Sequence, residues 1–275
     1  LDLVRLYGAD ATRYSLLHQA GAAQDVRFDA DIADNEVKAS VSAKAGQNFC
    51  NKLWNAARFV LMNLEGYNHS DDGAESTDLA DRWIHSRLAA TIARVTECQD
   101  AYRFSDVTRA LYDFLWRDYC DWFVELAKVR LNGDDKTERS CAQRALVVTL
   151  EQALRLMHPV MPFITENLWQ ALPKACDSPE SIMSASWPQQ DAAQRDEVAE
   201  REMQLIQEVI SAGRMVRSEL HVPPGRKLKA ILSAGSDDSV RILSSGCRLV
   251  EQLLAADEVT MGRGLEQPSA SGSAV

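Results

Sequence analysis

Helical periodicity governs the middle of the chain, from about Ser42 to Leu172. Over this stretch apolar residues recur every three or four positions, the spacing of one buried face of an α-helix, and short polar segments interrupt the pattern. The pattern predicts helices over residues 42–64, 79–100, 105–131 and 137–157, and a fifth helix that begins at Pro162. Long helices joined by short connections assemble into antiparallel bundles. The sequence therefore predicts a mainly α fold built on an antiparallel helix bundle.

Several residues mark where these helices begin and end. Thr77 and Asp78 precede the second helix and Ser105 opens the third, in the N-cap position that favours short polar side chains. Asn132-Gly133 closes the third helix, because glycine readily adopts the backbone conformation that follows a helix. Pro159 stops the fourth helix, since proline has no amide hydrogen to donate.

The regions on either side of the bundle are less regular. Residues 7–17 have helical spacing, and residues 26–28 alternate as a strand does. The Ser-, Ala- and Lys-rich residues 29–46 predict an exposed helical extension. Residues 189–202 form a charged linker, and the Gly- and Ser-rich residues 264–275 predict a disordered tail.

A small α/β unit is predicted between the linker and the tail, over residues 203–263. Its patterns are a helix over 203–220, a turn at 223–225, a strand over 228–234, a helix over 239–254 and a strand over 258–261. A strand, a helix and a strand in succession predict a parallel pair of strands joined by a right-handed crossover.

The basic residues gather in two places although the chain carries a net charge of −10. The first basic segment, between Val37 and Leu64, contains Lys38, Lys44, Lys52 and Arg58 and no acidic residue. The second, between Arg214 and Lys229, contains five basic residues and the single acid Glu219. Contacts with nucleic-acid phosphates need local positive charge, so these two segments are the candidates for nucleic-acid binding. The alternative for each is a solvated charged surface.

No motif in the sequence indicates catalysis, metal binding or membrane insertion. The six cysteines are scattered without a Cys-x-x-Cys pair, which predicts a reducing cytoplasm and no metal site. The sequence has no run of about 18 apolar residues and nothing that resembles a signal peptide. Phosphate-binding GxxxxGK(S/T), HExxH and GxSxG motifs are absent, so no catalytic residue is predicted. The chain begins with Leu1 rather than Met, which suggests a piece of a longer protein.

An unusual row of asparagines lies within the first bundle helix. Asn48, Asn51 and Asn55 recur at helical spacing, with Lys52 and Arg58 nearby, although asparagine is a poor helix former. A face of amide donors and acceptors suits unpaired nucleobases, which proteins read by hydrogen bonds to the base edges and by stacking. The alternative is an amphipathic core helix, whose buried side would consist of Phe49, Leu53, Trp54, Phe59 and Leu61.

Five stretches of the chain resemble bacterial valyl-tRNA synthetases, which are class I enzymes. The first is the Asn-rich stretch 48–60, and the others are residues 7–14, 25–29, 157–166 and 217–228. The stretch 157–166, MHPVMPFITE, is similar to a run shared by the valine, isoleucine and leucine enzymes, which often have leucine at the position of Met157. The stretch 217–228, with its Val-Pro-Pro-Gly-Arg-Lys turn, resembles the valine enzymes alone.

The resemblance implies the C-terminal part of such an enzyme. Residues 1–40 would belong to the linker after the catalytic domain, residues 41–188 to the anticodon-binding helical bundle and residues 203–263 to the small domain that follows. The HIGH and KMSKS motifs that activate the amino acid are absent, so this chain alone is expected to be inactive and to hold no cofactor. The parent enzyme would be a cytoplasmic monomer that uses ATP with magnesium to attach valine to its tRNA. The expected partners are valine tRNA and the catalytic domain of the same chain, and no membrane is expected to be a partner.

The resemblance also indicates which residues contact tRNA. Arg58 would donate to a base or phosphate and Phe59 would be a stacking surface, although Phe59 is equally consistent with a core position. Asn51, Lys52 and Asn55 are secondary candidates on the same helix. Lys44 is expected to contact backbone phosphate. Four residues of the second basic segment are expected to contact the tRNA stem or elbow: Arg214, Arg217, Arg226 and Lys227. The alternative for the second basic segment is packing of the small unit on the bundle.

Three other interpretations remain open at the level of sequence. The same domain of an isoleucyl- or leucyl-tRNA synthetase is the closest of them, and the Asn-rich helix and the turn at 223–225 favour the valine enzyme. A helical scaffold that binds another protein would show an exposed apolar groove and no response to RNA. A free-standing enzyme would need a catalytic constellation, which the sequence does not contain.

Overall fold

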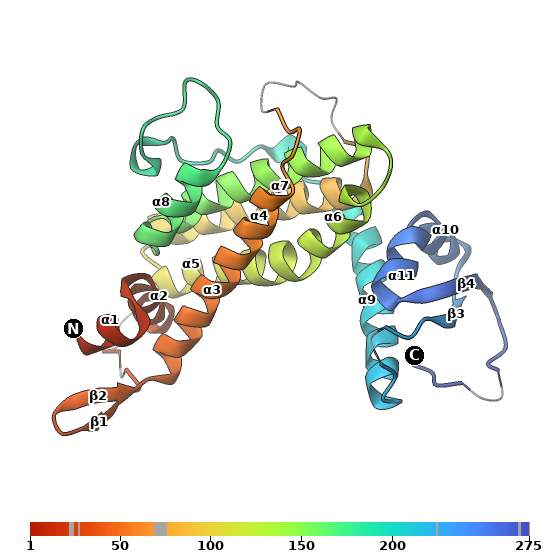
Figure 1. Ribbon diagram of the computed structural model, residues 1–275, viewed down its shortest axis with the longest axis horizontal. Coiled ribbons are helices and arrows are strands. Elements are labelled where there is room, and N and C mark those ends of the chain that lie inside the picture. Colours follow the sequence, from red (N-terminus) through yellow and green to blue (C-terminus); the bar gives the residue numbers. More distant parts are fainter. Residues whose placement is uncertain (22–24, 27, 69–75, 224, 269–270, 275) are drawn as a thin grey trace. The chain divides into compact units, whose positions relative to one another are not determined.

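The computed structural model describes residues 1–21, 25–26, 28–68, 76–223, 225–268 and 271–274. These residues form two compact units, Leu1–Arg195 and Asp196–Val275 (Figure 1). The first unit is mainly helical, and the second combines helices with a small sheet. In the described part of the chain, no helix is both long and apolar enough to cross a membrane.

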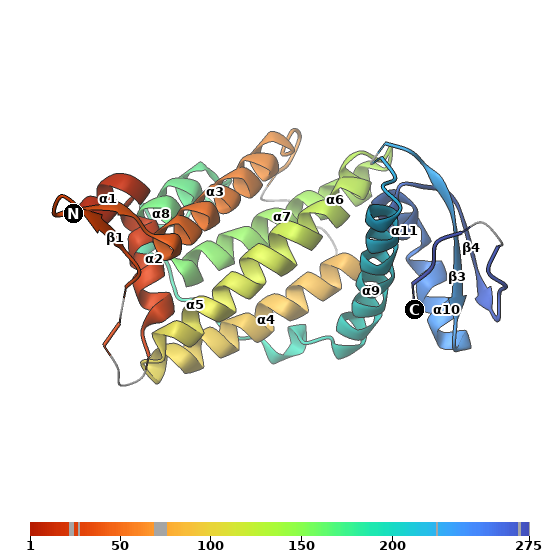
Figure 2. The same cartoon turned by 90° about the horizontal axis from the view of Figure 1, so that it is seen from below.

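Long helices form the body of the first unit. In Figure 2, α3, α7, α4 and the continuous run from α5 to α6 lie beside one another. The main elements are α1 (Asp2–Tyr7), α2 (Ala9–Gln19), β1 (Asp31–Ala33), β2 (Glu36–Ala39), α3 (Val41–Met62), α4 (Leu79–Asp100), α5 (Phe104–Tyr112), η1 (Asp113–Phe123), α6 (Val124–Leu131), α7 (Lys136–Met157) and α8 (Pro162–Ala171). Two short 3₁₀ turns follow, η2 (Ile182–Ser184) and η3 (Ala192–Gln194). The predicted helix bundle is confirmed.

The core of the bundle consists of large side chains from every long helix. Phe49 and Leu53 of α3, Leu88 of α4 and Tyr119 of η1 are almost completely buried. The buried Tyr119 hydroxyl donates a hydrogen bond of 2.9 Å to the carbonyl of Leu146 in α7. Burial of apolar surface of this extent is the main stabilising contribution to such a fold.

Local signals predicted most helix ends correctly. The Asp78 carboxylate accepts a hydrogen bond from the Ala80 amide, so α4 begins at Leu79 as predicted. The third helix ends at Leu131, before Asn132, and Pro162 opens α8. The prediction of a cap at Ser105 is wrong, because Ser105 lies inside the first turn of α5.

A tight reversal between α4 and α5 explains the error at Ser105. Tyr102 adopts a left-handed conformation with φ of 56°, and the Arg103 amide donates to the Cys98 carbonyl at 2.8 Å. The Tyr102 amide donates to the Gln99 carbonyl at 3.0 Å. These two bonds form the Schellman motif that often ends helices, usually with glycine in the left-handed position. The next helix starts at Phe104, so Arg103 occupies the N-cap position, and its side chain makes no capping hydrogen bond.

The third predicted helix contains a long π-helical segment. Its eleven central residues form η1, in which backbone hydrogen bonds join residues five positions apart. The apolar positions that predicted the helix are still buried, including Val107, Leu111, Phe114 and Phe123. Because the π-helix preserves a buried apolar side, the sequence pattern did not distinguish it from a continuous α-helix.

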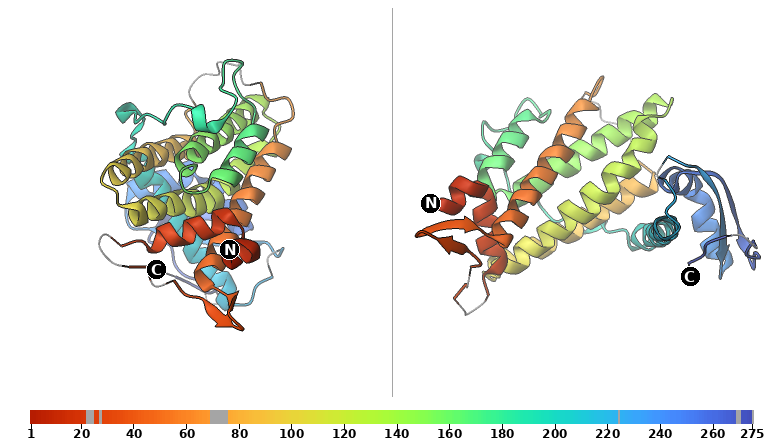
Figure 3. Two further views of the ribbon diagram at one scale, coloured as in Figure 1. Left: turned by 90° about the vertical axis from the view of Figure 1, so that its left-hand side faces the viewer. Right: turned by 60° about the horizontal axis from the view of Figure 1, so that its bottom comes forward.

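A β-hairpin replaces the predicted helical extension at residues 31–39. β1 and β2 pair in antiparallel fashion, and Asp34 and Asn35 between them have left-handed φ angles of 54° and 62°. Aspartate and asparagine tolerate this conformation, which a two-residue type I′ turn requires. Figure 3 shows that the hairpin leads directly into α3. The predicted strand at 26–28 is absent at Val26 and Phe28, and Arg27 lies outside the described residues.

Polar contacts fix α2 against the turn between α7 and α8. The buried Asp10 carboxylate accepts hydrogen bonds from the amides of Phe163 and Ile164, at 3.2 and 2.6 Å. It therefore caps the start of α8, where amide hydrogens have no partner within the helix. The Arg13 guanidinium donates to the carbonyls of Pro159 and Val160 at 2.9 and 3.1 Å.

The substitution Asp10→Ala is expected to lower the free energy of unfolding of the first unit by about 1–3 kcal/mol, because two amides at the start of α8 lose their acceptor. Urea unfolding followed by circular dichroism measures this change. Asp2→Ala is the matched control, since Asp2 is partly exposed and lies 3.9 Å from Arg5; its effect is expected to stay within about 0.5 kcal/mol. Equal unfolding midpoints for the two variants would contradict the capping role of Asp10.

The second unit pairs two parallel strands beside three helices. Its elements are α9 (Glu197–Glu219), β3 (Leu228–Ala234), α10 (Asp237–Ser245), α11 (Cys247–Leu254) and β4 (Ala256–Arg263). β3 and β4 form the predicted parallel pair. Buried Ile206 and Ile210 of α9 and Val250 and Leu254 of α11 belong to its core. The predicted small α/β unit is confirmed.

Two helix predictions in this unit are wrong in detail. α9 begins at Glu197 rather than at residue 203, because Asp196 caps it and acidic residues favour the first turn of a helix. The predicted helix over 239–254 is divided at Gly246 into α10 and α11. A Cβ at Gly246 would lie 2.5 Å from Cδ1 of Ile206, so a side chain at this break would force the buried Ile206 side chain of α9 to move.

The described residues test the loop and tail predictions only in part. The Arg226 amide donates to the Pro223 carbonyl at 3.0 Å, which closes a turn, whereas Pro224 lies outside the described residues. Residues 265–268 and 271–274 form no helix or strand. The predicted disorder of the tail, and the predicted domain boundaries, stay predictions.

Candidate nucleic-acid interface

One face of α3 is polar and exposed along most of the helix. We call this surface the α3 face; its residues are Lys44, Asn48, Asn51, Asn55 and Arg58. They follow one another at intervals of three or four, so they line one side of the helix. The opposite side carries the buried residues Ala43, Phe49, Leu53, Ala57 and Val60. The structure therefore brings the asparagine row to the surface, as its spacing predicts.

The start of α3 is held by side-chain caps. The Ser40 hydroxyl accepts a hydrogen bond from the Ala43 amide at 3.1 Å. The Asp29 carboxylate accepts from the amides of Val41 and Ser42, at 2.6 and 3.1 Å. A hydrogen bond from the Ser42 side chain, together with these amide bonds, holds the pKa of Asp29 below its usual range. Asp29 lies outside the helix, and α3 itself contains no acidic residue. Its exposed face is thus polar and basic.

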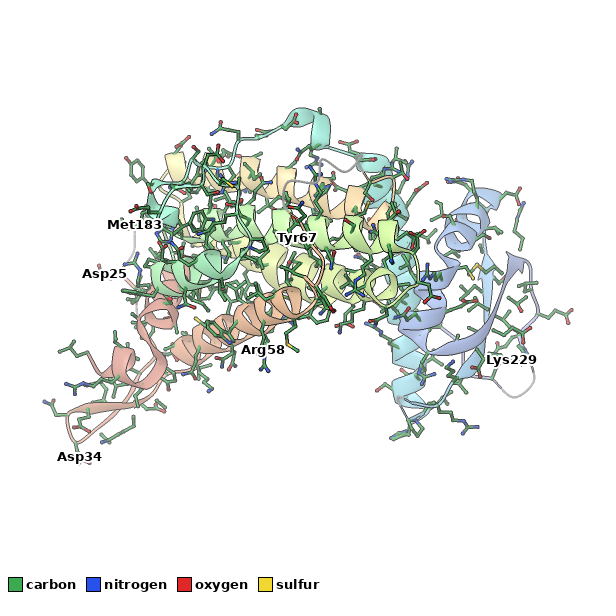
Figure 4. The ribbon with its side chains drawn as sticks, turned by 45° about the horizontal axis from the view of Figure 1, so that its top comes forward. Asp25, Asp34, Arg58, Tyr67, Met183 and Lys229 are labelled. Atoms are coloured by element: carbon green, nitrogen blue, oxygen red, sulfur yellow. The ribbon has the colours of Figure 1, made fainter. Side chains whose placement is uncertain are left out.

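Arg58 is exposed near the C-terminal end of the α3 face. Figure 4 shows its side chain on the outer side of α3, away from the other bundle helices. A guanidinium offers five donors in a planar fork and stays charged at every physiological pH. The position is therefore open to a base edge or a phosphate. Lys44, at the other end of the face, donates to Oε1 of Gln47 at 2.7 Å.

Lys52 lies at the border of the α3 face and is engaged by groups of η1. Its ammonium forms an ion pair with Asp121 and lies 4.2 Å from the centroid of the Trp116 ring. Its side chain is only 26% exposed. In this arrangement the positive charge of Lys52 is shared between a carboxylate and an aromatic ring.

Phe59 is half-buried, so its exposure is intermediate between that of a core residue and that of an open stacking surface, the two alternatives that the sequence left open. The ammonium of Lys128 lies 5.2 Å from the centroid of its ring and also pairs with Glu125 at 2.6 Å. A base that stacks on the face of the ring that Lys128 covers would have to move the Lys128 side chain aside. The stacking role of Phe59 stays a prediction.

Only some of the apolar residues of α3 that the core-helix alternative assigns to the buried side are in fact buried. Phe49 and Leu53 are fully buried, and Phe59 and Leu61 are half-buried. Trp54 is 46% exposed, so its assignment to the buried side is wrong. Trp54 follows Leu53 directly, and consecutive residues of a helix point in directions about 100° apart.

An aromatic cluster beside α3 was not predicted from the sequence. Tyr14 and Tyr112 both contact Phe49, with ring centroids 5.2 Å apart in each pair. Tyr112 stacks on Trp116 with centroids 5.2 Å apart and an interplanar angle of 20°. Because the four rings come from α2, α3, α5 and η1, local periodicity contains no sign of their contact.

Cys50 of α3, which is half-buried, and the buried Cys120 of η1 are neutral thiols at physiological pH. Burial raises the pKa of Cys50 to about 12, with a smaller contribution from the Asp10 carboxylate. Burial also raises the pKa of Cys120 to about 12. Nucleophilic attack and metal binding require the thiolate, so neither cysteine is suited to that chemistry.

The second basic segment is largely occupied by contacts within its own unit. Arg214 donates to the Leu253 carbonyl at 3.3 Å, and Arg217 donates to the carbonyls of Pro223 and Arg226 at 3.1 and 2.8 Å. Arg226 itself is exposed. Arg217 therefore joins the end of α9 to the turn after it, whereas Arg214 joins α9 to the C-terminal end of α11.

Acidic residues of β4 neutralise the lysines around β3. Lys227 pairs with Asp257 at 3.6 Å, and Lys229, labelled in Figure 4, pairs with Glu258 at 2.6 Å. The parallel pairing of β3 and β4 brings these acids close, although they lie far away in sequence. The excess of positive charge that the sequence predicted is thereby reduced, and the α3 face is the stronger candidate.

Comparison with known proteins identifies the family. Residues 81–232 match the family described as anticodon-binding domain of tRNA ligase. The chain belongs to this family of tRNA ligase anticodon-binding domains. Its relatives include proteins named valine–tRNA ligase, from Enterococcus faecalis with 37% identity over 276 residues and from Geobacter sulfurreducens with 40% identity over 272 residues. The predicted resemblance to valyl-tRNA synthetases is confirmed.

The chain corresponds to only part of these relatives. The matches cover 100% and 98% of the chain but 30% and 29% of the relatives' own lengths. Among solved structures, a leucyl-tRNA synthetase of Agrobacterium radiobacter K84, in a ternary complex with tRNA, is similar over 70% of this chain and 21% of that chain, with 18% identity and a TM-score of 0.48.

Proposed function

We propose that this chain binds the anticodon loop of tRNA, as part of a valine–tRNA ligase, through the α3 face. The observation that carries the proposal is the exposed row of three asparagines with Arg58, on a helix without acidic residues. Membership of the anticodon-binding family supports it. The names of the relatives support valine as the amino acid.

The chemistry of the α3 face suits bases that are already unpaired. Each asparagine amide offers two donors and an acceptor to a base edge, and Arg58 offers a planar fork. Stacking on an aromatic ring contributes ~1–3 kcal/mol per base. A good bidentate contact with a base edge contributes ~1–3 kcal/mol of discrimination in DNA recognition. Two bases read in this way would separate the correct tRNA from others by on the order of a hundredfold or more.

We extend the proposal to the parent enzyme. Valine activation with ATP and magnesium, transfer to tRNA and editing would lie in the parts of the relatives that this chain does not cover. The chain would then position the tRNA for a catalytic domain of the same polypeptide. A monomeric parent enzyme in the cytoplasm agrees with this role and stays part of the proposal.

A charge-changing substitution in the asparagine row tests the proposal. The double variant Asn51→Asp, Asn55→Asp keeps the side-chain size but adds two negative charges and removes amide donors, so binding of a valine-tRNA anticodon stem-loop is expected to weaken at least about tenfold. Fluorescence anisotropy with a labelled stem-loop measures this affinity.

The control for this test is Gln252→Glu, an exposed amide on α11 in the other unit. It is expected to leave the affinity within about twofold, since a single exposed charge outside the α3 face is screened by salt. If the double variant and the control bind the stem-loop as tightly as the unchanged chain does, the α3 face is not the RNA-binding surface.

A further inference from the structure

A partly covered tryptophan lies beside the α3 face. The Trp116 ring is half-buried in η1, and it is held by the stacked ring of Tyr112 and by Phe49, whose centroid lies 6.2 Å away. The Lys52 ammonium lies 4.2 Å from the Trp116 centroid. A fixed indole ring with a removable cation over it is therefore present at the border of the proposed RNA surface.

The cation over this ring has a second partner that is itself accessible. Asp121 pairs with Lys52, and its side chain is 45% exposed. Lys52 is four residues from Asn48 and three from Asn55, so it is a direct neighbour of the asparagine row on α3. An RNA strand that lies along the α3 face would bring its phosphates within reach of the same ammonium.

We propose that Trp116 is a stacking surface for an unpaired nucleobase, that Lys52 covers it in the free protein, and that RNA binding transfers Lys52 from the Asp121 carboxylate to an RNA phosphate. This inference rests on the proposed binding of an unpaired RNA loop by the α3 face. The exchange conserves charge pairing, because one anion replaces another on the ammonium. It also replaces a cation over the indole ring with a base.

Typical magnitudes favour this exchange. A cation over an aromatic ring corresponds to roughly a 2- to 5-fold effect on an equilibrium at an exposed site and to about 30-fold when the cation is desolvated, and the 26% exposed side chain of Lys52 lies between these limits. An exposed ion pair corresponds to at most about 5-fold. A base stacked on an aromatic ring contributes roughly 5- to 150-fold in affinity. The contacts that cover Trp116 are thus weak enough for a bound base and phosphate to replace.

The long π-helix supports a functional interpretation of this position. Such segments are usually a single turn and occur often at functional sites, whereas η1 extends over eleven residues. It contains both Trp116 and Asp121, so one element positions the ring and the carboxylate that engage Lys52.

Fluorescence quenching by acrylamide tests the covering of Trp116 without RNA. The Trp116 signal is the difference between the unchanged chain and Trp116→Phe. Lys52→Gln and Asp121→Asn are each expected to increase quenching of Trp116. The matched control is Asp113→Asn, because Asp113 lies in the same helix and pairs with Arg117 at 3.4 Å; it is expected to leave quenching unchanged. Unchanged quenching in both Lys52→Gln and Asp121→Asn would overturn the covering role of Lys52.

RNA binding by the same variants tests the exchange. Asp121→Asn is expected to tighten binding of the valine-tRNA anticodon stem-loop by about 2- to 5-fold, because Lys52 no longer has a competing carboxylate. Trp116→Leu is expected to weaken it by about 5-fold or more. Lys52→Gln is expected to lower the slope of log affinity against log salt by about 0.7, the loss of one phosphate contact. Asp113→Asn again is the control, with no change expected.

The outcomes separate this inference from the proposed function. If Arg58→Ala weakens stem-loop binding while Trp116→Leu and Asp121→Asn leave it unchanged, the exchange is overturned and the α3 face remains. If the unchanged chain and all variants fail to bind the stem-loop, both proposals are overturned. Tighter binding by Asp121→Asn, together with protection of Trp116 from acrylamide by RNA, supports the exchange.

Discussion

Replacement of Arg130 by methionine is expected to lower the free energy of unfolding of the first unit by about 3–5 kcal/mol. Arg130 is 6% exposed, and its guanidinium lies 2.8 Å from Oδ1 of Asp81 and 3.2 Å from Oδ1 of Asp78. Asp81 is only 1% exposed, so the substitution leaves a buried carboxylate without its counter-charge. Urea unfolding at pH 7.5 measures the loss.

Two further variants separate a buried ion pair from a general effect of losing arginine. Arg117→Met removes an exposed pair with Asp113 and is expected to cost less than about 1 kcal/mol. Adding Asp81→Asn to Arg130→Met is expected to restore part of the stability, because neither charge then remains. A loss for Arg130→Met no larger than that for Arg117→Met would contradict this account.

The stability loss of Arg130→Met should also depend on pH. Burial raises the pKa of Asp81, and the nearby Arg130 charge opposes that rise. Without Arg130, the folded state prefers the protonated carboxyl even more strongly. The contribution of Asp81 to stability is then fully present below its unfolded pKa of about 3.9 and is lost as the pH rises through the raised folded pKa. The difference from the unchanged chain should therefore be smaller at pH 4.5 than at pH 7.5; an equal difference would contradict the assignment to Asp81.

Arg58→Ala is expected to weaken binding of valine tRNA by about 10- to 100-fold, and to weaken binding of the same tRNA with an altered anticodon by much less. The reason is that a guanidinium bonded to a base edge contributes only when the correct base is present. Filter binding or anisotropy with both tRNAs measures the two affinities.

The control for Arg58→Ala is Arg109→Ala on α5, whose side chain is 63% exposed. It removes one positive charge from the surface of the same unit and is expected to change both affinities by about twofold or less. Equal weakening of the two tRNAs by Arg58→Ala would show a phosphate contact without base reading.

Local signals in the sequence predicted much of the fold. Asp78 determines the start of α4 through a hydrogen bond to Ala80, and Pro162 favours the start of α8 through its fixed φ angle, so their meaning is visible in a short stretch of sequence. The predicted cap at Ser105 is wrong because the left-handed Tyr102 and the hydrogen bonds of the Tyr102 and Arg103 amides end α4 immediately before α5. The hairpin was missed although Asp34 and Asn35 are residues that tolerate its turn.

The candidate site was predictable only where it depends on one helix. The spacing of Asn48, Asn51 and Asn55 predicted a common face, and the structure exposes it. The contact of Lys52 with Asp121 joins residues 69 positions apart, and that of Lys227 with Asp257 depends on strand pairing. Such long-range contacts depend on tertiary packing, and a local sequence pattern does not indicate which distant residues will pack together.

The most direct test of the central proposal is the affinity of the purified chain for valine tRNA and for the same tRNA with its anticodon changed, at low and at moderate salt. The account predicts tighter binding of the valine anticodon at both salt concentrations, because contacts with base edges persist when phosphate contacts are screened. Equal affinity for the two tRNAs, or no binding even at low salt, would contradict the reading of anticodon bases by this chain.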